Sequence, residues 1–241
     1  MISPSGPLLE ARNLSFAYNG AIAVSDVSIA VLPGEAVALL GANGAGKSTT
    51  VKLIAGVLKL QHGHILLAGE DVTGLPSHRM VENGITLVPE GRLVFPRLSV
   101  LENLQIGAHS RRAKARYAEN LERVFALFPR IAERKRQLAG SMSGGEQQMV
   151  AIARGLMSDP RLIMLDEPSL GLMRKMVDQL FDLIRAVRAT GVSLILVEQN
   201  AHQALGIADR AYVIEKGCVT IEGAGRDLLK NDVVRRSFLG L

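Results

Sequence analysis

The sequence predicts an α/β fold in which an inserted helical region interrupts a core of buried strands. Three observations lead to this prediction. Residues 36–40 are continuously apolar and run directly into a glycine-rich turn and a segment of helical spacing. Residues from about 97 to 158 then read as helical, and residues 161–222 return to alternating strands and helices. The 241 residues can form a single domain, with a core at about 1–89 and 160–241 and a helical region at about 90–159.

The first 88 residues are predicted to be rich in strands and to contain one helix. The strand candidates are apolar runs at residues 9–18, 27–32, 36–40, 64–67 and 84–88. The helix covers residues 48–58, where apolar side chains recur at helical spacing at Val51, Ile54, Ala55 and Leu58.

The remaining elements follow from the same periodicities. One amphipathic helix, which we expect to stop at Pro129, carries its apolar face at Tyr117, Leu121, Val124, Phe125 and Phe128. A second helix covers residues 149–157, and a third, at 175–189, joins apolar strands at 162–165 and 193–197. Cys218 lies in an apolar alternation from Val213 to Ile221, so we expect a buried structural thiol there.

The bulk composition is that of an ordinary globular protein, with 48% hydrophobic and 21% charged residues. The single cysteine excludes an internal disulfide and agrees with a reducing cytoplasm. The N-terminus has neither the basic opening nor the apolar core of a signal peptide, and no apolar run approaches the roughly 20 residues that a membrane helix needs. If the protein serves a membrane, we expect it to do so peripherally.

The net charge of +5 is concentrated in residues 91–140, which hold eleven basic and four acidic side chains. A solvated helix face explains this excess most simply, and proximity to anionic lipid head groups is the functional alternative. Nucleic acid is not an expected partner, because no aromatic side chains interleave with the charges as stacking platforms.

The turn after residues 36–40 fits the phosphate-binding pattern G-x-x-x-x-G-K-[ST]. Its glycines let the backbone approach a phosphate closely, and the following helix offers its positive amino end. In this pattern Lys47 reaches the β- and γ-phosphates, and the Ser48 hydroxyl is a ligand of Mg²⁺. The candidate nucleotide-binding residues are Gly41, Asn43, Gly44, Ala45, Gly46, Lys47, Ser48 and Thr49.

Two further motifs point to phosphate chemistry. The apolar strand at 162–165 ends in Asp166 and Glu167; an Asp there can hold Mg²⁺, and an adjacent Glu can deprotonate a water. Ser143 and Glu146 have the spacing of a capping box at the start of a helix. A capping box does not explain the consecutive glycines Gly144 and Gly145, which suit a close approach to an anion.

Together these motifs resemble an ABC-type ATPase cassette, and the resemblance covers nearly the whole chain. It implies a P-loop NTPase (RecA-like) core with an antiparallel β subdomain and an inserted α-helical subdomain. It also implies that Ser143, Gly144, Gly145 and Glu146 bind ATP held by a second cassette in a head-to-tail dimer. Tyr18 lies where the family places an aromatic that stacks on adenine, although a core tyrosine on a strand is the alternative.

A finer resemblance is to the smaller ATPase subunit of branched-chain amino-acid importers. It rests on four stretches: 88–96, 143–148, 167–171 and 197–201. It implies a cassette at the cytoplasmic face of the membrane, bound to two integral-membrane permease subunits and indirectly to a solute-binding protein. Residues 90–96 would then receive the permease.

The chain departs from the general cassette at three places. Glu90 stands where most members have glutamine, and Gln199 where most have a histidine that contacts the γ-phosphate. The resemblance implies catalytic roles for Glu167, Gln199 and Glu90, and Mg²⁺ ligands at Ser48, Glu90 and Asp166. Met173 stands where many members have aspartate in the loop that crosses the dimer.

Three other functions stay open at this point. Cassettes of urea or short-amide importers look very similar. A soluble cassette of translation or DNA maintenance usually carries two cassettes or long coiled-coil arms, which this chain lacks. A non-catalytic nucleotide switch is disfavoured by the intact Lys47, Asp166 and Glu167.

Overall fold

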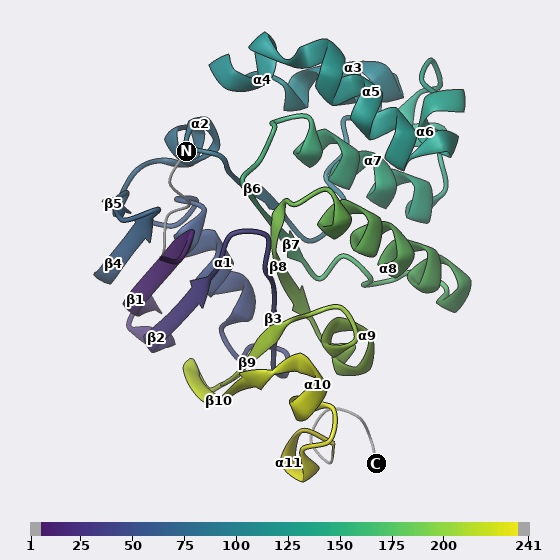
Figure 1. Cartoon of the computed structure of the whole chain (residues 1–241). Coiled ribbons are helices and arrows are strands. Elements are labelled where there is room, and N and C mark those ends of the chain that lie inside the picture. Colours follow the sequence, from purple (N-terminus) through teal and green to yellow (C-terminus); the bar gives the residue numbers. More distant parts are fainter. Residues whose placement is uncertain (1–5, 236–241) are drawn as a thin grey trace. The chain divides into compact units, whose positions relative to one another are not determined.

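The computed structural model describes residues 6–235, which form two compact units (Figure 1). The first unit comprises the described residues up to Met80 together with those from Ser193 onward, and the second is Val81–Val192. Both units combine strands and helices, so the predicted α/β fold is confirmed.

One antiparallel sheet of the first unit has the strand order β2-β1-β4-β5. Its strands are β1 (Leu9–Tyr18), β2 (Ala21–Val31), β4 (His62–Leu67) and β5 (Glu70–Asp71). β2 begins six residues earlier than the predicted strand at 27–32, because Asn19 and Gly20 form a tight hairpin turn with φ of 47° and 86°.

The second sheet of this unit has the order β10-β9-β3-β8. β3 (Ala36–Leu40) is buried along its whole length between its parallel neighbours β8 (Ser193–Glu198) and β9 (Arg210–Glu215). β10 (Cys218–Ala224) pairs antiparallel with β9 at the edge. As expected for a strand with parallel neighbours on both sides, β3 is entirely apolar.

The helices of the first unit are short. They are α1 (Lys47–Ile54), α9 (Ala201–Leu205), α10 (Gly225–Leu228) and α11 (Asp232–Val234), and α2 (Ser77–Glu82) leads into the second unit. α1 ends four residues before the predicted limit of 58. The chain turns at Ala55 and Gly56, where Gly56 has φ of 64° and a Cβ would collide with the carbonyl oxygen of Leu75.

The prediction of a buried thiol was wrong, because Cys218 is exposed. It is the first residue of β10, directly after the turn at Lys216 and Gly217. The alternation from Val213 to Ile221 spans two antiparallel strands and the turn between them, so it does not continue one buried face.

In the second unit, β6 (Ile85–Val88) and β7 (Leu162–Asp166) run parallel to each other. Helix α7 (Gly144–Leu156) packs on these strands and on α3 (Val100–Gly107). α5 (Tyr117–Leu127) and α6 (Pro129–Glu133) also contact α7, whereas α4 (Arg111–Ala115) and α8 (Arg174–Ala189) contact α5. A short 3₁₀ turn, Ala139–Ser141, precedes α7. α5 ends just before Pro129, as predicted.

One buried acidic residue is shared by three of the basic side chains of this unit. Asp159, whose side chain is 8% exposed, lies 3.7 Å from Arg112, 3.1 Å from Arg116 and 3.3 Å from Arg123. The main-chain oxygen of Asp159 also accepts a hydrogen bond from Arg112. These arginines therefore tie α4 and α5 to the segment between α7 and β7, and are not simply a solvated face.

Candidate functional site

The glycine-rich turn lies between the end of β3 and the start of α1, as the phosphate-binding pattern requires. Gly46 caps α1 with φ of 108°, and a Cβ at this position would collide with the carbonyl oxygen of Ala23. A Cβ at Gly41 would collide with the carbonyl oxygen of Ile214. The turn is thus pressed against β2 and β9, and only glycine fits at these two positions.

The lysine of the motif is held close to the turn. Lys47 is 4% exposed, and its ammonium donates to the carbonyl oxygens of Gly41 at 2.8 Å and Ala42 at 3.1 Å. The next turn of α1 is tied down by Thr50, whose hydroxyl donates to the carbonyl oxygen of Gly46 at 2.9 Å. A fixed ammonium group beside the amino end of a helix is a suitable site for an anion.

The middle of the turn is open to solvent. Asn43 and Gly44 are exposed, Ser48 and Thr49 are half-buried, and Ala45 is buried. A cavity of about 360 Å³ borders the turn, lined by residues 42–45 and by Ile214, Glu215 and Lys216. The main-chain N–H of Gly217 donates to the carbonyl oxygen of Ala45 at 2.9 Å, which fixes the wall of this cavity.

Two more candidate residues belong to the first unit. Gln199 is exposed directly after β8, and because β8 runs parallel to β3, it lies at the same sheet edge as Gly41. Tyr18 ends β1, is 45% exposed and packs edge-on against Phe16 with ring centroids 4.8 Å apart. Tyr18 is therefore not a core residue.

His202, three positions after Gln199, is exposed in α9.

The acidic candidates lie in the second unit. β7 is wholly buried and ends in Asp166, which is 1% exposed. Glu167 follows with 8% exposure and φ of 47°, a left-handed backbone that costs a non-glycine residue about 1–3 kcal/mol. Glu90 is exposed just after β6, and because β6 pairs in parallel with β7, it follows the same edge as Asp166.

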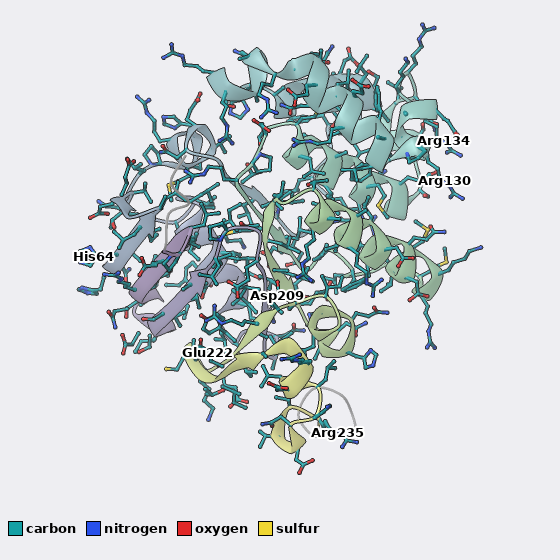
Figure 2. The ribbon with its side chains drawn as sticks, viewed as in Figure 1. His64, Arg130, Arg134, Asp209, Glu222 and Arg235 are labelled. Atoms are coloured by element: carbon teal, nitrogen blue, oxygen red, sulfur yellow. The ribbon has the colours of Figure 1, made fainter. Side chains whose placement is uncertain are left out.

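The start of α7 has the predicted capping box. The Ser143 hydroxyl accepts from the Glu146 N–H at 3.4 Å, and the Glu146 carboxylate accepts from the Ser143 N–H at 3.0 Å and its hydroxyl at 2.8 Å. These bonds from Ser143 lower the pKa of Glu146, and Arg134, 3.0 Å away, and Arg130 assist them. Figure 2 labels both arginines at α6.

The flexible ends of two long side chains lie beside Gly144 and Gly145, so packing alone does not require glycine at either position. A Cβ at Gly144 would meet the guanidinium group of Arg92, and a Cβ at Gly145 would meet the end of the Met176 side chain. Arg92 thus lies over the first residue of α7, a contact that sequence reasoning missed. No sequence periodicity predicts this contact, because it depends on an irregular segment. Gly91, Arg92 and Leu93 all have positive φ there, of 89°, 66° and 44°.

A second cavity, of about 270 Å³, lies in the second unit between β6, α3 and α7. Its rim carries exposed apolar side chains, Leu93 at 60%, Phe95 at 46% and Ile106 at 39%. Arg154 of α7 lines it and lies over the Phe95 ring, 5.3 Å from the centroid. We refer to this cavity and its rim as the Arg154 pocket.

Comparison with known proteins identifies the family of the chain. The family model for the ABC transporter matches residues 24–170. The chain is 48% identical over 233 residues to BraG of Pseudomonas aeruginosa, a high-affinity branched-chain amino acid transport ATP-binding protein, covering 97% of this chain and all of BraG. It is 34% identical over 233 residues to LptB of Escherichia coli K12, a lipopolysaccharide export ATP-binding protein, covering 96% and 97% of the two chains.

Among solved structures, the ADP conformation of MJ1267, an ATP-binding cassette of an ABC transporter, matches with a TM-score of 0.84. That match has 26% identity and covers 98% of this chain and all of MJ1267. A nucleotide-free ABC-transporter cassette matches with the same TM-score, at 25% identity and the same coverage.

Proposed function

The chain belongs to the ABC transporter family and is an ATP hydrolase, and we propose that it energises an importer of branched-chain amino acids. The observation that carries the substrate class is the identity to BraG, 48% against 33–36% for the lipopolysaccharide export proteins. The alignments with BraG and with the lipopolysaccharide export protein both cover nearly the whole chain, so the two sequence identities are compared over almost the same residues.

The triphosphate binds at the amino end of α1 in this proposal. Main-chain N–H groups of the turn and the ammonium of Lys47 hold the β- and γ-phosphates, and Tyr18 stacks on the adenine. The half-exposed ring of Tyr18 and the hydrogen bonds that fix Lys47 support these roles.

Glu167 orients and deprotonates the attacking water. A general base contributes about 10²–10⁴ in rate, and the strained backbone at Glu167 is typical of a functional residue. Gln199 donates a neutral hydrogen bond to a γ-phosphate oxygen. Because charge-assisted hydrogen bonds are about twice as strong as neutral ones, we expect a modest intrinsic rate of hydrolysis.

The residues present suit Mg²⁺, which prefers oxygen ligands and keeps several waters and phosphate oxygens. Ser48, Glu90 and Asp166 offer a hydroxyl and two carboxylates. Among residues 6–235, no cluster of three or more acidic, His or Cys side chains could hold a metal ion. When bound, the ion would neutralise charge on the β- and γ-phosphates.

A second cassette, a copy of this chain or a sister subunit, completes the site. Ser143, Gly144, Gly145 and Glu146 at the start of α7 bind the γ-phosphate held by that cassette. ATP closes the pair and hydrolysis reopens it. The 13-residue α7 has the positive end of its dipole at these residues, which supports an anion-binding role.

Two permease subunits receive this motion at the cytoplasmic face of the membrane, and one of them docks at the Arg154 pocket of this chain. None of the helices in the described part of the chain is long and apolar enough to cross a membrane. The exposed rim of Leu93, Phe95 and Ile106 supports a docking role. Phe95→Ala should weaken retention of the permease in a pull-down, and unaltered retention would count against this contact.

The test of the transport proposal is uptake by vesicles that contain the chain, its co-encoded permease subunits and the solute-binding protein. We expect ATP-dependent accumulation of leucine, isoleucine and valine, and none of urea or acetamide. Uptake of the amides alone would assign the chain to the other importer class.

A further inference from the structure

The two halves of the proposed nucleotide site belong to different sheets of the first unit. Tyr18, the proposed adenine platform, ends β1 and pairs with Ala21 of β2 in the antiparallel sheet. The phosphate turn, residues 41–46, follows β3 of the other sheet. Adenine stacking and phosphate binding therefore occur together only if the distance between the β1–β2 hairpin and the phosphate turn is fixed.

The turn between β9 and β10 lies between these two halves. Its two residues are Lys216 and Gly217, with φ of 49° and 83°, the backbone of a tight two-residue hairpin. The N–H of Gly217 donates to the carbonyl oxygen of Ala45 in the phosphate turn at 2.9 Å. The N–H of Ser25 in β2 donates to the carbonyl oxygen of Gly217 at 2.8 Å. Gly217 is thus hydrogen-bonded to both halves.

Close packing of backbone atoms leaves this bridge little freedom. A Cβ at Gly217 would lie 3.0 Å from the carbonyl oxygen of Ala23 in β2, and a Cβ at Gly46 would collide with the same oxygen. The Cβ position of Gly46 is also only 3.4 Å from the Cα of Gly217. Because β2, the β9–β10 turn and the phosphate turn meet through their main chains, a displacement of the β9–β10 turn changes the separation of the other two.

The phosphate turn keeps its own shape by other contacts. The ammonium of Lys47 donates to the carbonyl oxygens of Gly41 and Ala42, and the N–H of Ala45 donates to that of Ala42 at 3.2 Å. These bonds lie within the turn and its own lysine. The bonds of Gly217 therefore act on the position of the phosphate turn relative to β2, and not on the way in which the turn wraps a phosphate.

We propose that Gly217 is a positioning residue, which sets the distance between Tyr18 and the phosphate turn to the span of an adenine nucleotide. This inference rests on the proposed function, because it takes Tyr18 as the adenine platform. A base stacked on an aromatic ring contributes about 5- to 150-fold in affinity, and a platform displaced from the phosphate turn loses part of this contribution. Ligands that consist of phosphate alone do not depend on this distance.

The first test compares Gly217→Ala with Gly69→Ala. Gly69 belongs to an equivalent two-residue turn between β4 and β5, with φ of 84° after Ala68 at 51°, and nothing lies within 4 Å of its Cβ position. The control therefore has the same backbone strain without the contact to β2. Calorimetric titration of the full chain measures binding of ADP and of inorganic pyrophosphate, which both lack the γ-phosphate that would close a pair of cassettes.

The expected result is a selective loss of nucleotide binding. Gly217→Ala should weaken ADP binding at least about fivefold and change pyrophosphate binding by less than about twofold. Gly69→Ala should change neither by more than about twofold. Equal losses of ADP and pyrophosphate binding in Gly217→Ala would limit the β9–β10 turn to shaping the phosphate turn and would overturn the proposal, as would unchanged ADP binding.

A glycine inserted between Lys216 and Gly217 is a second variant, because it lengthens the turn without adding a side chain. It should have the same selective effect on ADP, and a matched glycine between Ala68 and Gly69 should have none. The insertion decides the question if Gly217→Ala does not fold. A chain with the insertion that binds pyrophosphate and ADP as the wild type does would overturn the proposal.

A Tyr18→Ala background separates positioning from a general structural effect. Since no ring then stacks on the base, Gly217→Ala should change ADP binding in this background by less than about twofold. A full additional loss there would make Gly217 a structural residue and overturn the inference. Tyr18→Ala with unchanged ADP binding would reject the adenine role in the proposed function, whereas a loss with Tyr18→Ala and none with Gly217→Ala would reject only the role of Gly217.

Discussion

The phosphate-binding turn offers a sharp test of the packing described above, in the substitution Gly46→Ala. Gly46 has φ of 108°, and its Cβ would collide with the carbonyl oxygen of Ala23. Gly44, two residues away, has φ of 77° but nothing within 4 Å of its Cβ position. The positive φ destabilises alanine at both positions, and only alanine at position 46 also has a steric clash.

The magnitudes follow from these two terms. A left-handed backbone costs a non-glycine residue about 1–2 kcal/mol, and overpacking a rigid contact costs about 1–3 kcal/mol. Gly44→Ala should therefore lose about 1–2 kcal/mol of unfolding free energy, and Gly46→Ala about 2–5 kcal/mol. At about 2–4 °C per kcal/mol for a chain of this size, Gly46→Ala should melt about 2–12 °C below Gly44→Ala.

Thermal melting of the nucleotide-free proteins, followed by circular dichroism, measures this difference. Nucleotide must be absent, because ligand binding would add its own stabilisation. If the two variants melt together, the contact between Gly46 and β2 does not hold the turn in place, and the reasoning fails.

Three further perturbations test other parts of the chain by the same melting measurement. Ser143→Ala removes a helix cap and should cost about 1 kcal/mol. Because Ser143 lowers the pKa of Glu146 below 4.5, this loss should be full above that pH and should shrink as the pH falls through the lowered value. Met173→Asp should stabilise the chain by about 0.5–2 kcal/mol, since Met173 begins α8 without a side-chain cap. Asp159→Asn should cost on the order of 2 kcal/mol, because three arginines lose their common partner.

Each of these has an outcome that contradicts it. A loss for Ser143→Ala that stays unchanged as the pH falls through the titration of Glu146 would remove Glu146 from the explanation. Met173→Ala is the matched control for the cap, since Met173 is 78% exposed, and equal stability of the two variants would exclude capping. No change for Asp159→Asn would show that its arginines are solvated equally well without it.

The sequence was informative wherever the signal is local. The strand at 36–40 has the predicted bounds, and the capping box of Ser143 and Glu146 forms as its spacing indicated. The Asn19-Gly20 dipeptide is also a local signal, because it strongly favours a hairpin turn, and it explains why β2 begins before the predicted strand at 27–32.

Other features depend on contacts between distant residues and could not be read from the sequence. The exposure of Cys218 follows from the pairing of β9 with β10. The convergence of α4 and α5 arginines on Asp159 joins residues more than thirty positions apart, and a run of basic residues alone reads as a solvated surface. The contact of Arg92 with Gly144 is likewise a consequence of tertiary packing.

The most direct test of the catalytic account is the Glu167→Gln variant, assayed for Mg·ATP binding and for phosphate release. The account predicts ATP affinity like that of the wild type, a stabilised dimer, and a rate of phosphate release reduced by about 10²–10⁴. Near-normal phosphate release from this variant would show that another group takes the proton from water.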